Sequence, residues 1–196
     1  MEVFRFGDDS SMGTVAGAVA LANGDIVVLA VKSPDWSLVR CNFRGEPTAK
    51  IELSGVPADF SPGALRAANG KLYLADGNRL KVVVVEISGA VSAVWDLAKV
   101  LKLDVKKHPG NDLRGFNVDA SGDILGTITG LFLAFVLTPE GEMHSFGTRG
   151  SGPGKFNIVA GIAADEIGHL FVTDTLRAVV IAFDKELKFV GEFSRR

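Results

Sequence analysis

The sequence predicts an all-β fold made of four similar units, a β-propeller of four-stranded antiparallel blades. Two glycines separated by six residues recur four times in the 196 residues. The second glycines, Gly24, Gly70, Gly122 and Gly168, lie 46, 52 and 46 residues apart. A spacing in the forties is typical of architectures that repeat one supersecondary unit. Short apolar runs rich in β-branched residues follow each pair, which indicates strands rather than helices.

Four strands are expected in each repeat, and turn residues mark their ends. The first strand begins at the first glycine of the pair, and the second follows the second glycine, where Asn-Gly at two of the four sites is a strong hairpin signal. The second strands are expected at residues 26–32, 72–77, 124–129 and 170–175. The third strands are expected at 37–43, 81–87, 131–137 and 178–184, and the fourth at 49–53, 90–97, 142–147 and 189–194.

These strands lack polar and apolar alternation and are apolar on both faces, as expected for sheets that lie between neighbouring sheets. One such unit cannot bury both faces alone, so the units must stack. The repeats span residues 15–53, 61–97, 113–147 and 159–194 of a single propeller domain over residues 1–196. Residues 1–7 resemble the fourth strand at 142–147 and are expected to form an extra outer strand.

Composition limits the classes of function. With 47% hydrophobic residues the chain can bury a sizeable core. Its net charge of −2 supplies no field that would attract nucleic acid or an anionic membrane. No apolar stretch reaches membrane-spanning length, and the N-terminus is no signal peptide, so we expect a soluble protein, extracytoplasmic if a signal peptide has been removed. The single cysteine, Cys41, is expected to be a buried thiol.

The fourth repeat contains a more specific pattern. A Gly-rich lead-in and a Phe precede a Gly-Ile-Ala-x-Asp strand, and then follow a glycine, a strand ending in Asp, an Arg, and a strand ending in Phe-Asp. The residues are Gly154, Phe156, Gly161, Ile162, Ala163, Asp165, Gly168, Asp174, Arg177, Phe183 and Asp184. This pattern resembles the NHL repeat. The second repeat shares Gly63, Gly70, Tyr73, Asp76 and Arg79 with it, whereas the first and third have Ala30 and Ile128 in place of the strand-ending Asp.

The resemblance implies a fold and a choice of functions. NHL propellers usually have six blades, and many are platforms for binding protein or RNA. A non-enzymatic scaffold for protein–protein interaction is therefore the leading expectation, with no catalytic residues and no cofactor. Two alternatives stay open: a metal-dependent hydrolase, lactonase or lyase with the metal on the propeller axis, and an RNA-binding platform, which the negative net charge disfavours.

The number of repeats departs from the family. Four repeats are fewer than six, and the expected outer strand at residues 1–7 leaves the strand types unequal in number. We therefore expect a partial or open propeller that belongs to a larger assembly, and a closed four-bladed ring with one surplus strand is the alternative. Unpaired blade faces must be covered, so the chain should associate with itself or with a protein partner through its end blades.

The binding residues are expected on the loops that join one blade to the next and on the turns between second and third strands, which share a face. Long loops on a rigid scaffold are common recognition sites, and Trp36 stands out there as an aromatic residue on a loop. The candidates are Trp36, Asp59, Asp76, Arg79, Asn111, Asp112, Arg114, Arg149, Lys155, Asp174 and Arg177.

Structural roles compete with binding at these positions. Asp76 and Asp174 are each followed three residues later by Arg, which is typical of a carboxylate that accepts backbone N–H groups while the Arg pairs with it or with a neighbouring blade. Oxygen ligands for calcium, the metal of the enzyme alternative, would be Asp59, Asn111, Asp112, Asn117 and Asn157. A basic stretch (Lys102, Lys106, Lys107, His108 and Arg114) is expected to be a solvated loop, and residues 94–105 have partial helical periodicity.

Overall fold

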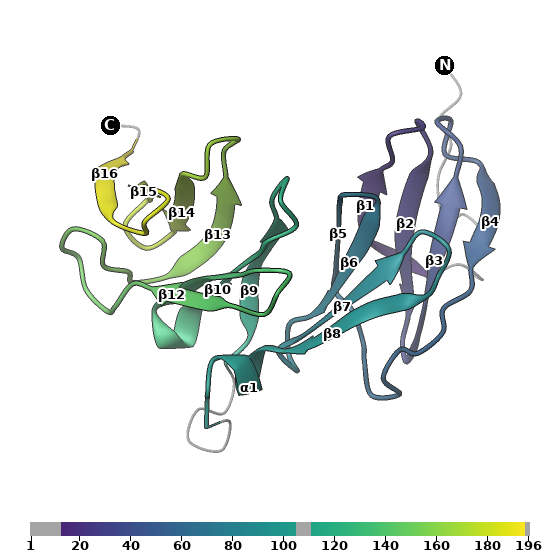
Figure 1. Ribbon diagram of the computed structural model, residues 1–196, viewed down its shortest axis with the longest axis horizontal. Helices are drawn as coiled ribbons and strands as arrows, with labels where there is room; N and C mark the ends of the chain where they lie inside the picture. Colours follow the sequence, from purple (N-terminus) through teal and green to yellow (C-terminus); the bar gives the residue numbers. More distant parts are fainter. Residues whose placement is uncertain (1–12, 105–110, 195–196) are drawn as a thin grey trace. The chain divides into compact units, whose positions relative to one another are not determined.

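The computed structural model describes residues 13–104 and 111–194 and consists almost entirely of β-structure (Figure 1). Sixteen described strands form four separate four-stranded sheets in which every neighbouring pair is antiparallel and consecutive in sequence, where a pairing is recorded. Each sheet corresponds to one predicted repeat, and we call the sheets blades one to four. The expected outer strand at residues 1–7 and the basic residues 106–108 lie outside the described part of the chain.

The chain forms two compact units, Met1–Trp95 and Asp96–Arg196, each holding two blades. Blade one comprises β1 (Thr14–Ala20), β2 (Ile26–Lys32), β3 (Asp35–Cys41) and β4 (Pro47–Ile51). Blade two comprises β5 (Ala64–Ala68), β6 (Lys71–Asp76), β7 (Lys81–Glu86) and β8 (Val91–Asp96).

The second unit repeats this plan. Blade three comprises β9 (Leu113–Val118), β10 (Ile124–Ile128), β11 (Leu133–Leu137) and β12 (Met143–Phe146), with a 3-10 turn, η1 (Thr129–Leu131), between β10 and β11. Blade four comprises β13 (Val159–Ala164), β14 (Leu170–Asp174), β15 (Val179–Phe183) and β16 (Phe189–Phe193). The predicted strands are thus present, and the third strands of blades three and four begin slightly later than expected.

The second glycine of every pair occupies the turn between the first and second strands. All four have positive φ, between 71° at Gly70 and 91° at Gly122. A side chain is strained at such an angle, which explains why glycine recurs there. The first glycines do not open the first strands as expected: Gly17, Gly115 and Gly161 lie within β1, β9 and β13, and Gly63 immediately precedes β5.

Apolar side chains fill the space between the two blades of each unit. In unit one, Leu29 and Leu38 of blade one and Leu72 and Leu74 of blade two are fully buried in one cluster. In unit two, the corresponding cluster is aromatic at its outer end, where Phe146, Phe156 and Phe183 meet edge to face. Burial of such faces is the main source of stability for a blade.

Helical structure is minimal. The segment expected to have helical character begins as strand β8 and then forms one helical turn, α1 (Leu97–Val100), capped by the side chain of Asp96. Leu97 is the buried residue of α1. Among the described residues neither α1 nor η1 approaches the length needed to cross a bilayer.

Candidate functional site

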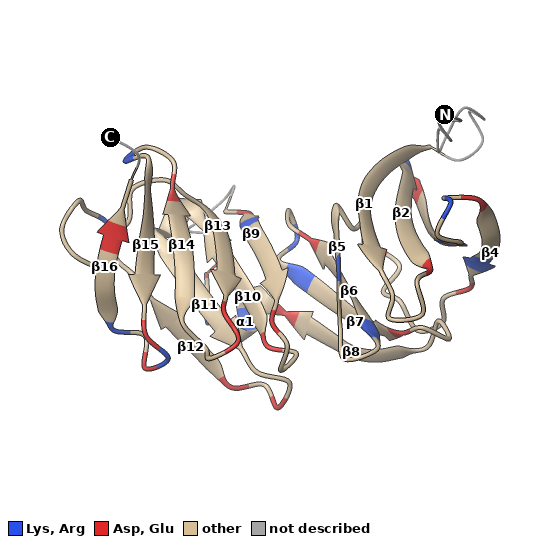
Figure 2. Cartoon of the chain, turned by 90° about the horizontal axis from the view of Figure 1, so that it is seen from above, with Lys and Arg blue, Asp and Glu red and all other residues tan. Residues whose placement is uncertain are grey.

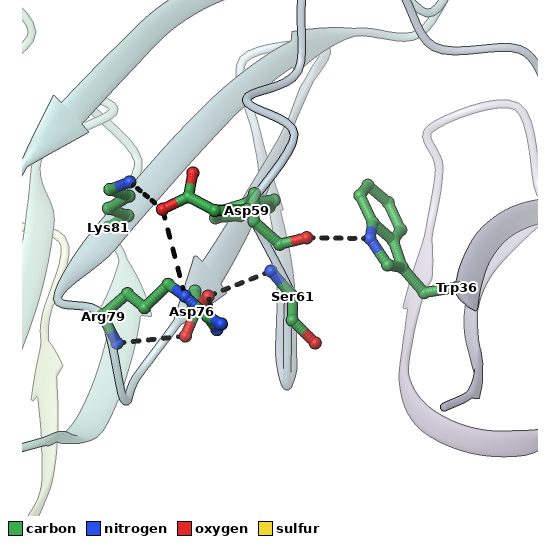
Figure 3. A network of polar contacts seen from close by, with 7 residues as sticks. Trp36, Asp59, Ser61, Asp76, Arg79 and Lys81 are labelled. Atoms are coloured by element: carbon green, nitrogen blue, oxygen red, sulfur yellow. Dashed lines mark hydrogen bonds and ion pairs between the residues drawn. The ribbon is translucent and has the colours of Figure 1, made fainter. Parts of the chain in front are cut away.

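A buried carboxylate ties together the loops at one edge of blade two. Asp76, the last residue of β6, is only 1% exposed. Its carboxylate accepts hydrogen bonds from the backbone N–H of Ser61 (2.9 Å), in the loop that leads into the blade, and of Arg79 (3.1 Å), in the β6–β7 turn. The Arg79 guanidinium lies 3.1 Å from the same carboxylate (Figure 3). Asp76 therefore holds both loops in place, and Arg79 of the β6–β7 turn balances its negative charge.

Two further candidates join this network. Asp59 accepts a hydrogen bond of 2.7 Å from Lys81 and lies 4.0 Å from Arg79 (Figure 3). The hydrogen bond from Lys81 holds the pKa of Asp59 below its usual range. Trp36 donates its indole N–H to the carbonyl oxygen of Phe60 (3.1 Å) and meets the Phe60 ring edge to face at 5.9 Å. The lead-in loop at 59–61 is thus fixed from both sides.

Trp36 differs from the expectation in its location. It lies within strand β3, is half-buried, and packs against the core of unit one. The turn before it is shorter than expected because the strand pairing continues to Lys32 and Asp35. The sequence analysis did not identify Phe60 as the partner of Trp36. Phe60 is 4% exposed and supplies both the carbonyl oxygen and the aromatic ring that Trp36 contacts.

A buried aspartate holds the loops of blade four in a similar way. Asp174, the last residue of β14, is 1% exposed and accepts backbone hydrogen bonds from Asn157 (2.7 Å), Ile158 (3.2 Å) and Arg177 (3.2 Å). Here the arginine pairs elsewhere. Arg177 donates to Glu192 on β16 and to the carbonyl oxygen of Lys155. The predicted structural role of both Asp residues is therefore visible in the hydrogen bonds that they make.

These contacts set the protonation state of Asp174. Burial opposes its ionisation, but the backbone N–H groups of Asn157, Ile158 and Arg177, together with the charge of Arg177, outweigh burial and lower the pKa of Asp174. The carboxylate is consequently ionised at neutral pH and fixes the loop as a charged acceptor.

The remaining candidates lie in unit two, and each makes a contact of its own. Arg114 was expected on a loop but is the second residue of strand β9. Asn111 lies against Gly130 in the turn after β10, because a Cβ added to that glycine would be 2.1 Å from the Asn111 side-chain oxygen. Asp112 and Arg114 are 3.9 Å apart and largely exposed. Arg149 stacks over the ring of Phe132 at 5.3 Å. Lys155 is exposed and contributes its backbone to the contact with Arg177.

Three of the proposed metal ligands make hydrogen bonds to other groups. Asp59 is bound by Lys81, Asn117 donates to the carbonyl oxygen of Ile162, and Asn157 donates to Ser151. Within residues 13–104 and 111–194, no three His, Cys, Asp or Glu side chains are grouped so that they could hold a metal ion. The binding of calcium by oxygen ligands of other types stays a prediction.

Two threonines were missed by the sequence analysis. Thr127 and Thr173 occupy the same position in β10 and β14, and each accepts a hydrogen bond from the first glycine of its repeat: Gly115 N–H at 2.8 Å and Gly161 N–H at 2.7 Å. The signal was the 46-residue spacing, which relates both members of the two pairs.

Four consecutive antiparallel blades, stacked face to face within each unit, define this chain as a β-propeller protein. The fold is similar to the structure of a streptogramin B lyase (TM-score 0.66, 16% identity, 94% of this chain and 55% of that one). It is similar to virginiamycin B lyase from Staphylococcus aureus (0.65, 16%, 95% and 57%) and to YCF48 bound to a D1 peptide (0.61, 12%, 92% and 54%).

These likenesses concern the fold alone, since the identities are low. The chain spans little more than half the length of the structures that it matches. No family model matches the sequence, and neither does any curated protein.

Proposed function

We propose that this chain is a single NHL-type propeller domain that acts as a non-enzymatic scaffold for a protein partner, as part of a larger assembly. The observation that carries the proposal is a rigid loop edge that presents apolar side chains. At blade four this edge exposes Leu176 (66%) and Ile158 (43%) beside the buried Asp174.

The two apolar side chains are attached to backbone that is fixed on both sides. Ile158 donates its N–H to Asp174, and its carbonyl oxygen accepts from the Thr175 N–H at 2.8 Å, immediately before Leu176. A partner that covers Leu176 and Ile158 would therefore pay little conformational entropy in the loops. Binding residues are commonly carried by loops that a rigid scaffold holds in place.

One of the structural neighbours supports the proposed role in binding a protein partner. YCF48 is a propeller-type neighbour solved with a D1 peptide bound. That protein shows that a similar fold is compatible with peptide binding. The polar candidates on this chain make contacts that stabilise the loops, which leaves the exposed apolar groups to make contact with a partner.

An affinity capture experiment with two matched variants tests the proposal. Leu176→Asp places a charge at the loop edge of blade four, and Ile167→Asp does the same at the β13–β14 turn, where Ile167 is 70% exposed. We expect one protein to be retained by the natural chain and by Ile167→Asp, and about tenfold less by Leu176→Asp. The retained protein, once purified, should show the same order of affinity in calorimetry. Equal retention by all three chains would contradict the proposal.

The enzyme alternative is retained because two neighbours are named as lyases. It predicts that calcium raises the unfolding temperature of the chain by preferential binding to the folded state. It also predicts that Asp59→Asn or Asn157→Ala abolishes that increase. An unchanged unfolding temperature over the full range of calcium concentration argues against this alternative.

A further inference from the structure

The face that blade three turns toward blade four shows what a covered propeller face requires. At Gly115 in β9, an added Cβ would lie 2.5 Å from the carbonyl oxygen of Ala160, which belongs to β13. The Thr127 hydroxyl accepts from Gly115 N–H and donates to the same Ala160 oxygen at 3.3 Å. The glycine thus leaves room for the first strand of the next blade, and the threonine hydrogen-bonds to the backbone of that strand.

Unit one uses the same glycine position. An added Cβ at Gly17 in β1 would lie 3.2 Å from the side chain and 3.3 Å from the backbone nitrogen of Leu65 in β5. In both described blade pairs, the first glycine of the earlier blade therefore lies against the first strand of the following blade.

Blade four has the same pair, and within the described part of unit two no further strand lies against it. An added Cβ at Gly161 would have Thr173 of its own blade as its nearest neighbour, at 3.1 Å, and no atom of blade three within 4 Å. The Thr173 hydroxyl accepts from Gly161 N–H, and among the described residues it has no acceptor for its own proton. Gly161 and Thr173 are therefore arranged like the glycine and threonine of blade three. Thr173, however, has no described counterpart of the backbone carbonyl oxygen that accepts from Thr127.

The rest of this face is apolar. The register places Phe171 beside Ala163 and Ala182, and Thr173 beside Val180, which pairs with Phe193. Phe193 is 57% exposed and, with Thr173 and Val180, lines a hollow of about 380 Å³. Strands β13, β14 and β15 contain no charged residue other than Asp174, the last residue of β14, and their ribbons are almost free of charge colours in Figure 2. Alternation along β14 places Asp174 on the opposite, buried face.

Strand β1 of unit one offers a surface that matches this face. β1 has no buried residue, whereas each of β5, β9 and β13 has at least one. Val15 is 43% exposed and pairs with Ala30, on the side of blade one that faces away from the core shared with blade two. A hollow of about 770 Å³ lies on this side and is lined by Ala30, Ser37 and Val39 among others.

We propose that the Gly161–Thr173 face of blade four binds β1 of a second copy of this chain, with the Thr173 hydroxyl donating to a backbone carbonyl of that strand. The two surfaces are the two halves of the interface that unit one and unit two each contain once. A contact between different surfaces of identical chains is head to tail, so it closes into a ring or continues as a filament. The proposal deepens the assembly role proposed above and uses a surface different from the Leu176 loop edge.

Analytical ultracentrifugation of the 196-residue chain tests the contact. We expect species larger than one chain at about 100 μM, because interfaces between whole blade faces are of the size of stable protein contacts. Gly161→Ala should shift the dissociation constant upward by about tenfold or more, since the methyl group would occupy the place of the incoming strand. The matched control is Gly152→Ala, where an added Cβ meets nothing closer than 3.8 Å.

Phe193→Ser provides a second variant should Gly161→Ala perturb the blade, because Phe193 is exposed in the outer strand. It should weaken assembly while leaving the circular dichroism spectrum unchanged. A chain that stays monomeric at the highest concentration, or Gly161→Ala and Phe193→Ser assembling as well as the natural chain, would overturn the proposal.

Cross-linking determines whether the contact is head to tail. A chain with Ala18→Cys and a chain with Ala163→Cys should form mixed disulfide dimers when oxidised together, and few dimers when oxidised separately. The natural Cys41 is fully buried and should not compete. Predominance of like-with-like dimers would overturn the proposed arrangement. Leu176→Asp should leave assembly intact, and Gly161→Ala should leave partner capture intact, so the two proposals can fail independently.

Discussion

Blades three and four have the same glycine and the same threonine at equivalent positions and differ in what covers this pair. Gly115 and Thr127 of blade three lie against the backbone of blade four, and Thr127 is fully buried. Gly161 and Thr173 repeat them on a face that no other described strand of unit two covers. At the end of the second strand the blades differ in sequence as well: Ile128 is an apolar core residue, whereas Asp174 binds three backbone N–H groups.

The comparison separates two uses of the repeat. The glycine–threonine pair makes contacts between blades, so its contribution to stability depends on whether a neighbouring blade is present. The Asp–Arg pair serves contacts inside one blade, so Asp174 is satisfied without a neighbour. A repeat can therefore lose its aspartate, as blade three has, and still stack on the next blade.

The largest expected effect is that of adding one methyl group to the covered face. Gly115→Ala would bring Cβ to 2.5 Å from a backbone oxygen that cannot move independently, and we expect a loss of about 3 kcal/mol in the free energy of unfolding. The matched change Gly161→Ala should cost about 1 kcal/mol or less in the single chain. Urea unfolding of both variants measures the difference, and equal losses would break the comparison.

Removing the charge of Asp174, which holds the loops of blade four, should have the next largest effect on the free energy of unfolding. Asp174→Asn keeps the shape but loses one charged acceptor oxygen, which should cost about 2 kcal/mol at pH 7. The folded pKa of Asp174 lies below the unfolded value of 3.8, so its stabilisation is complete above pH 3.8 and is lost as pH falls through the folded pKa.

The pH dependence of urea unfolding checks this sign. The difference between the natural chain and Asp174→Asn should be constant from pH 7 to about pH 5 and narrow at lower pH. Asp112→Asn is the control, since its carboxylate is exposed and its ion pair with Arg114 is long at 3.9 Å. A difference that widens on acidification would show that Asp174 is not held as a carboxylate.

The threonine pair should show a smaller difference in the same direction. Thr127→Val leaves the buried Gly115 N–H without its acceptor and the Ala160 oxygen without its donor, which should cost about 2 kcal/mol. Thr173→Val removes one hydrogen bond on a less buried face and should cost about 1 kcal/mol. Thermal unfolding of the two variants at equal chain concentration measures the ranking. The reverse order would mean that the blade-four face is the more tightly covered one.

The smallest effect concerns the ion pair that blade four has and blade three lacks. Arg177 binds Glu192, whereas Leu131 and Ser145 stand at the corresponding positions of blade three. Glu192→Gln should cost about 0.5 kcal/mol, because the carboxylate is partly exposed, and the cost should shrink in high salt. Unfolding at low and high salt checks this, and a salt-independent loss would point to packing rather than charge.

Much of the architecture was readable from local patterns. The glycine spacing gave the number of blades, and the apolar runs gave the order and approximate bounds of the strands, because turn geometry and strand periodicity are properties of short segments. The Asp–Arg spacing likewise predicted the loop-holding role of Asp76 and Asp174. The loop location predicted for Trp36 was wrong, since pairing between β2 and β3 extends the strand through that residue.

The candidate site was less readable because most of its contacts join residues that are far apart in sequence. Nothing local to Trp36 indicated that it would donate to the Phe60 carbonyl, 24 residues away. The pairing of Arg177 with Glu192 rather than with its own Asp174 also depends on where β16 lies relative to the β14–β15 turn.

The order of the amino acids specifies a repeated antiparallel blade, its tight glycine turns and the carboxylates that hold its loops, since each depends on backbone conformation or hydrogen bonding within a short range. Which copy of a repeated residue is covered depends instead on how the blades pack. Gly115 and Gly161 are equivalent in sequence, but one meets the backbone of a neighbouring blade and the other meets only its own. That difference arises from stacking between blades, which no single repeat encodes.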